Sequence, residues 1–203
     1  MGTRGSLIIA IDGVLKETYN HYDSYPEELG ENILTELKKI DAGGEDAWKK
    51  FKANAKKLKL VGKSKASKTL QEKYTKFYDG HVNGGDKADW YCLLRECQGA
   101  NYIPNIASGE VAHMVDGSGF HKDSLFCEYA YVIDLDKMEI EFYEGFQNKK
   151  QVGNRFGEVA AKTYFPVAKV GSLPLIGISK DKKASEEMMK LYTKFGEENK
   201  QTE

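Results

Sequence analysis

The clearest fold signal in the sequence is SLIIAIDGVLKETYNHY, residues 6–22. Its first half is mainly apolar, and after Asp12-Gly13 its second half alternates apolar and polar side chains. An Asp-Gly pair supplies the two positive-φ positions of a type I′ turn, so this stretch is predicted to form a tight β-hairpin. Residues 7–11 are apolar on both faces, which is typical of a strand in the middle of a sheet.

A second hairpin is predicted further along the chain. Residues 126–135 are apolar on both faces apart from Glu128 and, where the turn at 134–137 begins, Asp134; residues 138–143 then alternate apolar and polar. Helical periodicity is found at residues 29–40, 48–58, 70–77, 90–97 and 184–195. Residues 100–123, rich in turn residues, are predicted to be irregular. Together these elements predict an α+β fold, with a mainly antiparallel sheet of two hairpins and about five helices segregated on it.

Length and composition favour one soluble domain. At 203 residues, 40% hydrophobic and 30% charged, the chain is expected to form a single α+β domain over 1–203, with a lysine-rich helical subdomain or insertion at 45–80. No apolar run approaches the ~20 residues of a membrane-spanning helix, and the start lacks a signal-peptide pattern. With three cysteines, an odd number, these features predict a cytoplasmic protein without membrane contact.

Charge is distributed unevenly. Residues 49–76 carry eleven lysines and one acid, Glu72, which leaves the rest of the chain strongly acidic although the total is −1. This block could bind an acidic protein through Lys49–Lys76, or could be a solvated helix face. The 30 basic residues include only three arginines, at positions 4, 95 and 155, so specific recognition of nucleic acid is not expected.

The densest polar cluster is YNHYDSY, residues 19–25, where the first hairpin meets a helix. His21 and Asp23 could form an acid/base pair, and the amides at the helix start could hold an anion. The same residues could simply cap the helix and pack. Glu128 is the only charge inside an apolar strand, so it is either a structural anchor, with Arg4 as a partner, or a site residue.

A second cluster lies in the irregular segment and could bind a ligand or form a turn-rich surface loop. Its members are Glu110, His113, Asp116, His121 and Asp123. Their spacing fits no metal template, so no metal and no cofactor are expected. We therefore take His21, Asp23 and Glu128 as candidate catalytic residues. The candidate ligand-binding residues are Arg4, Tyr19, Asn20, Ser24, Tyr25 and His113.

Three motifs, MGTRG at 1–5, YNHYDSYP at 19–26 and DSLFCEYAYVIDL at 123–135, resemble a family of bacterial, phage and fungal proteins to which no activity is assigned. The early hairpin is also similar to that of N-terminal nucleophile hydrolases, which expose Cys, Ser or Thr as the first residue after processing. Here removal of Met1 would leave Gly2, and only a further cut would free Thr3.

Three functions follow as hypotheses. The first is a small-ligand-binding protein that takes a polar or nucleotide-like molecule by aromatic stacking, His21 and helix-start amides; the phage resemblance implies sequestration of a host signalling nucleotide as an anti-defence role. The second is a hydrolase in which His21 works with Asp23 or Glu128. The third is an interaction module that masks a host protein. The sequence does not indicate an oligomeric state.

Overall fold

The first hairpin forms as the sequence predicts and supplies the centre and one edge of the main sheet. The structure, a computed structural model, describes residues 2–200. Met1, the first residue of the MGTRG motif, and residues 201–203, the end of the predicted domain, lie outside the described residues. Strand β1 (Gly5–Ile11) pairs antiparallel with β2 (Val14–Asn20). Asp12 and Gly13 at the turn have φ values of 51° and 71°, as a type I′ turn requires.

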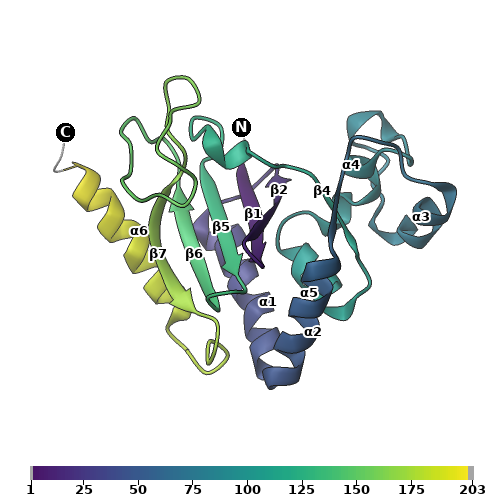
Figure 1. The fold of residues 1–203 in the computed structure, drawn as a ribbon, viewed down its shortest axis with the longest axis horizontal. Helices are drawn as coiled ribbons and strands as arrows, with labels where there is room; N and C mark the ends of the chain where they lie inside the picture. The colour runs from purple at the N-terminus through teal and green to yellow at the C-terminus, as the bar shows by residue number, and fades with distance from the viewer. Residues whose placement is uncertain (1, 201–203) are drawn as a thin grey trace.

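The second hairpin joins the first through a parallel pairing. Its strands are β5 (Tyr129–Asp134) and β6 (Glu139–Glu144), and β7 (Ala168–Pro174) follows at the other edge. The strand order is β2-β1-β5-β6-β7, with β1 and β5 parallel and the other neighbours antiparallel. The expected α+β fold with a mostly antiparallel sheet is therefore confirmed, and β1 lies in the interior of the sheet (Figure 1).

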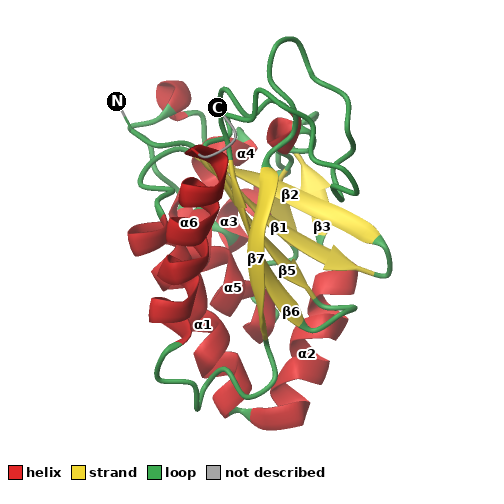
Figure 2. Cartoon of the chain, turned by 90° about the vertical axis from the view of Figure 1, so that its left-hand side faces the viewer, coloured by secondary structure: helices red, strands yellow, loops and turns green. Residues whose placement is uncertain are grey.

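Four longer helices cover one face of this sheet. They are α1 (Glu31–Ala42), α2 (Gly44–Lys57), α5 (Tyr102–Ser108) and α6 (Ala184–Lys200). A π-helical turn, Pro26–Gly30, precedes α1, so the regular helix begins two residues after the start of the predicted periodicity at residue 29. Figure 2 shows α1, α5 and α6 on the same side of the sheet.

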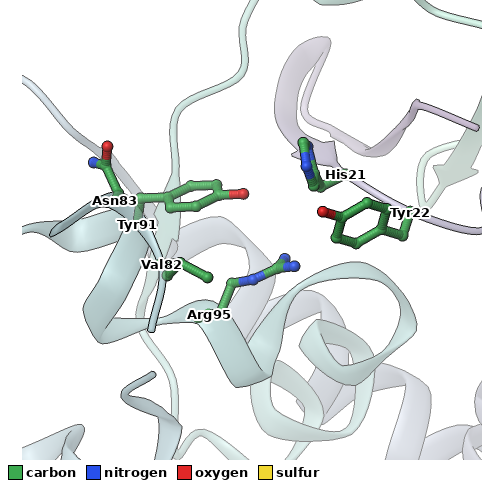
Figure 3. A pocket seen from close by; sticks show the side chains of 6 residues that line it. All are labelled: His21, Tyr22, Val82, Asn83, Tyr91 and Arg95. Carbon is green, nitrogen blue, oxygen red and sulfur yellow. The ribbon is translucent and has the colours of Figure 1, made fainter. Parts of the chain in front are cut away.

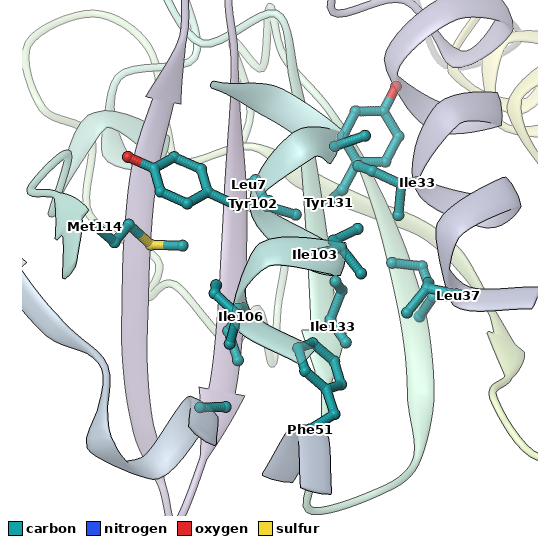
Figure 4. Close-up of a cluster of buried hydrophobic side chains, with 14 of the residues drawn as sticks. Leu7, Ile33, Leu37, Phe51, Tyr102, Ile103, Ile106, Met114, Tyr131 and Ile133 are labelled. Carbon is teal, nitrogen blue, oxygen red and sulfur yellow. The ribbon is translucent and has the colours of Figure 1, made fainter. Parts of the chain in front are cut away.

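The main core lies between that face and the helices. Leu7 and Ile133 from the central strands meet Ile33, Leu37 and Phe51 from the helices, all fully or almost fully buried (Figure 4). Each such side chain contributes about 1.5–3 kcal/mol when it leaves water. The apolar spacing of the helices thus fixes which sheet face they cover.

The other sheet face is covered by loops. Ile8, Ala10 and Val132 form a smaller core there with Phe156 and Val167 of the β6–β7 connection. That connection, residues 145–167, contains no helix or strand. A connection of this length without regular structure is uncommon in a compact domain, and such loops often have a functional role.

A smaller lobe follows α2 and contains short elements. These are β3 (Lys59–Val61), α3 (Lys68–Lys73), the 3₁₀ turns Thr75–Phe77 and Asn83–Gly85, α4 (Trp90–Leu93) and the 3₁₀ turns Arg95–Cys97 and Gly99–Asn101. β3 pairs parallel with β4 (His113–Val115), beside the main sheet. Figure 1 shows α3 and α4 extending away from the sheet, whereas α2, also from the 45–80 range, packs with α1 and α5.

One predicted feature is wrong: residues 100–123 are not irregular throughout. They contain α5, β4 and a 3₁₀ turn, Phe120–Lys122. Pro104 lies in the first turn of α5, where its missing N–H leaves no hydrogen bond unmade. Gly109, with φ of 85°, ends the helix as a left-handed cap. No helix within residues 2–200 combines the length and apolar character needed to cross a bilayer.

Candidate ligand-binding site

A cavity of about 570 Å³ lies where the end of β2 meets the smaller lobe. Its lining residues come from three segments: His21 and Tyr22 follow β2, Val82 and Asn83 belong to the loop before α4, and Tyr91 and Arg95 come from α4 and the turn after it. Figure 3 shows the side chains of Tyr22, Tyr91, Arg95 and His21 arranged around one common space. We call this the Arg95 pocket.

Arg95 is held by aromatic rings and not by an acid. Its guanidinium carbon lies 5.6 Å from the ring centre of Tyr91 and 5.9 Å from that of Tyr22. Within residues 2–200, Arg95 forms no salt bridge, whereas Arg4 pairs with Glu128 and Arg155 with Asp134 and Glu141. A half-buried guanidinium without a carboxylate partner keeps its forked donors available for an anion.

His21 is positioned by its strand neighbours. Its Nδ1 lies 2.7 Å from the hydroxyl oxygen of Tyr19, and its backbone N–H donates to Gln98 Oε1 at 3.3 Å. Burial raises the pKa of Tyr19, so the phenol stays neutral beside the imidazole. The His21 ring meets Tyr22 edge-on, with centres 4.1 Å apart. His21 therefore lines a cavity that could hold a ligand, whereas Tyr19 contacts His21 from behind and does not line it.

Asn20 and Ser24 organise the turn and are buried below it. Asn20 Nδ2 donates to Ser24 Oγ at 2.8 Å and to the Tyr22 carbonyl at 2.5 Å. Ser24 in turn accepts, through its carbonyl, a hydrogen bond from Tyr131 Oη at 2.9 Å. These contacts hold the backbone that presents Tyr22, so the two residues support the pocket from beneath without lining it.

Asp23 and Tyr25 lie on the exposed side of the same turn. Asp23 has a positive φ of 52°. The backbone N–H of Leu29 donates to the Asp23 carbonyl, and the backbone N–H of Glu28 donates to the Tyr25 carbonyl. These two amides at the start of the helical segment are thus already bonded within the chain. No hydrogen bond joins His21 to Asp23 in the described residues, and the partner found for His21 is Tyr19.

Glu128 meets Arg4, as the sequence suggested for a structural anchor. Glu128 Oε1 accepts from the Arg4 backbone N–H at 3.1 Å and lies 4.0 Å from its Nε. The register places Gly5 opposite both Asn20 and Tyr129, so Arg4, His21 and Glu128 lie at one end of the sheet. No hydrogen bond or ion pair links Glu128 to His21 in residues 2–200.

The second predicted cluster is dispersed. His113 packs on Trp90, with ring centres 5.1 Å apart, and its Nδ1 lies 2.8 Å from Tyr74 Oη; burial lowers its pKa. The other members have separate partners: Glu110 pairs with Lys76, Asp116 accepts from Ser118 N, His121 meets Glu17, and Asp123 accepts from Leu125 N. These residues do not form one site.

The lysine block is partly neutralised inside the molecule. Four of its lysines pair with acids: Lys49 with Glu45, Lys56 with Asp12, Lys65 with Asp86 and Lys76 with Glu110. All four acids, Asp12, Glu45, Asp86 and Glu110, come from outside the 49–76 range. The charge presented by this surface is lower than the sequence count.

Sequence reasoning missed Tyr22, Tyr91 and Arg95 as site residues. One signal was present, because Tyr91 and Arg95 are four residues apart on a predicted helix and therefore lie on one side of it. Nothing in the sequence connects them with Tyr22, which lies nearly 70 residues earlier. The contact arises only when the smaller lobe packs against the end of β2.

The pocket combines a free guanidinium, two tyrosine rings and an imidazole around a space of ligand size. Such a set can pair with an anion and stack on a planar ring. Comparison with protein-family models, curated proteins and solved structures gives no match, so the geometry of the pocket itself is what indicates a function.

Proposed function

We propose that the protein binds a small anionic ligand that carries a planar ring, of the nucleotide class, in the Arg95 pocket. The observation that carries this proposal is the position of Arg95, which lies between two tyrosine rings and is the arginine that no acid of residues 2–200 neutralises. A phosphate would pair with the guanidinium, and a base would stack on Tyr22 or Tyr91. A volume of about 570 Å³ is within the range of small-molecule sites.

The alternative of an acidic protein bound through Lys49–Lys76 has less support. Four lysines of that block already pair with acids of the chain itself. Exposed ion pairs are weak, so this does not exclude such a partner. It means that part of the positive charge of the block is already balanced within the chain.

The test compares ligand binding by the wild type and by Arg95→Gln. Binding of adenosine and guanosine mono- and diphosphates is measured by calorimetry and by thermal shift. We expect a nucleoside phosphate to stabilise the wild type, and the variant to bind about 10–100-fold more weakly, since a charge-assisted hydrogen bond contributes about 1.5–3 kcal/mol. Adenosine and inorganic phosphate separate the stacking and anion contributions.

Arg4→Gln is the matched control: the sequence suggested Arg4 as a ligand-binding residue, but in the structure it does not line the Arg95 pocket and already has Glu128 as a partner. It should bind like the wild type. Equal binding by wild type and Arg95→Gln, or no response to any nucleoside phosphate, would contradict the proposal. Chromatography of the recovered ligand distinguishes sequestration, which returns it intact, from hydrolysis assisted by His21.

A further inference from the structure

A buried carboxylate–imidazole pair lies on the loop-covered face of the sheet, apart from the Arg95 pocket. Glu17 of β2 and His121 of the 3₁₀ turn Phe120–Lys122 are 104 residues apart, and their side chains are 2% and 8% exposed. Glu17 Oε2 lies 2.8 Å from His121 Nδ1. Burying two ionisable groups costs free energy unless they pair with each other and form further hydrogen bonds.

The hydrogen bonds around Glu17 define the state of His121. Glu17 Oε1 accepts from Ser6 Oγ at 2.7 Å and from the His121 backbone N–H at 3.0 Å. Oε2 accepts from the Gly119 N–H at 2.6 Å as well as facing Nδ1. A carboxylate surrounded by four donors acts only as an acceptor, so Nδ1 carries a hydrogen and Nε2 is the nitrogen left for another partner.

That other nitrogen belongs to a residue that lines a cavity. The space, about 340 Å³, is bounded by Leu15, Glu17, His121, Lys122, Arg155 and Phe156, with Ser118 and Gly119 at its margin. Within residues 2–200, no hydrogen bond engages His121 Nε2. The ring itself is fixed by Phe156, whose centre is 4.1 Å away.

The charged groups around His121 come from three elements. Glu17 lies on β2, Lys122 follows His121 in the same turn, and Arg155 comes from the 145–167 loop. Arg155 is engaged by Asp134 and Glu141, and Glu17 is saturated by its four donors. Lys122 is exposed and forms no salt bridge in the described residues. The charge that remains available to a ligand here is therefore positive.

We infer that this cavity is a second ligand site, which takes a small oxyanion, a phosphate or a carboxylate. His121 meets it through Nε2 as an imidazolium, with Glu17 balancing the charge at Nδ1 and Lys122 at the rim attracting the anion. The proton on Nε2 is supplied by solvent or by the acid form of the ligand. The pair can then return that proton, which is the arrangement used in general acid–base chemistry.

The experiment follows the imidazole signals of the four histidines by NMR while inorganic phosphate, or in a second series acetate, is added. Arg95→Gln protein is used throughout, so that phosphate in the Arg95 pocket does not contribute. We expect the His121 signal, assigned with His121→Gln, to move saturably toward the imidazolium position. A response to phosphate alone assigns the site to phosphates, and a response to both assigns it to oxyanions in general.

Lys122→Gln tests the site without disturbing a buried group and should weaken the response several-fold. Lys57→Gln, at an exposed lysine of α2 away from the cavity, should match the parent protein. A His121 signal that ignores both anions, or equal movement of all four histidine signals, would overturn the inference. Because Arg95→Gln weakens the Arg95 pocket and His121 does not line that pocket, the His121 response is distinguishable from binding at the proposed nucleotide site.

Discussion

Arg155→Met is expected to lower the free energy of unfolding by about 3 kcal/mol, because it leaves buried carboxylates without their main counter-charge. Asp134 and Glu141 have side chains only 4% and 2% exposed, and Arg155 bonds to both. Together with Glu139, their carboxylate oxygens lie within 4.8 Å of one another. Urea unfolding of wild type and variant at pH 7 measures the loss.

The effect of Arg155→Met should shrink in acid. Burial acts to raise the pKa of Asp134 and Glu141, but hydrogen bonds and the charge of Arg155 outweigh it and hold both pKa values below their usual range. Groups with a lowered folded pKa contribute stability at neutral pH, which is lost as the pH falls below about 4 and through the folded values. The difference between the two proteins is therefore largest at neutral pH.

Lys169→Met provides the control for Arg155. Lys169 also bonds to Glu141, at 2.8 Å, but its side chain is 39% exposed and it does not reach Asp134. Its loss should cost clearly less than that of Arg155. If the two substitutions cost the same, or if Arg155→Met is as stable as wild type at pH 7, the network does not have the role assigned to it.

Lys16→Met is expected to cost about 3 kcal/mol, since it removes the cap of α2 from a buried position. Lys16 Nζ donates to the carbonyls of Ala55, Lys56 and Leu58 at 2.7, 2.9 and 2.7 Å. Those carbonyls lie at the end of α2, where the regular backbone hydrogen bonds of the helix stop; the Ala55 carbonyl also accepts from the Leu58 N–H at 3.2 Å. Methionine keeps the apolar stem but supplies no donor, so all three carbonyls lose the hydrogen bond from the Lys16 ammonium.

The loss is measured by urea unfolding with Lys57→Met as the comparison. Lys57 is the last residue of α2 and is exposed, so its replacement should change stability by less than about 0.5 kcal/mol. A Lys16→Met protein within that same range of wild type would show that water replaces the lost ammonium donors.

Local patterns in the sequence predict the local structure of this protein well. The type I′ turn at Asp12-Gly13, the apolar strand that becomes β1 and the helical periodicity at 29–40 that becomes α1 each depend on a few adjacent residues. The parallel pairing of β1 with β5 is different, because both strands are buried on both faces and any apolar strand satisfies that pattern. The sequence therefore specifies the hairpins but not how they are joined.

The candidate sites show the same limit. The sequence marked the turn after β2, and His21 does line a cavity there, but Arg95 comes from a lobe whose docking no periodicity reveals. Glu17 lies in a strand that alternates apolar and polar residues, and His121 lies in a turn-rich segment, so the sequence indicated burial of neither. Only the packing of residues 117–121 across β2 places one against the other.

The parallel pairing of β1 with β5, which joins the two hairpins, also determines when the sheet can form during synthesis. Arg4 and Glu128, which flank the paired starts of β1 and β5, are 124 residues apart in the chain. During synthesis β5 must leave the ribosome before it can pair with β1. Until then the first hairpin exposes the apolar edge of β1 without a pairing strand. Such a high contact order slows folding and leaves a nascent strand open to aggregation, which makes this protein a candidate for chaperone assistance during translation.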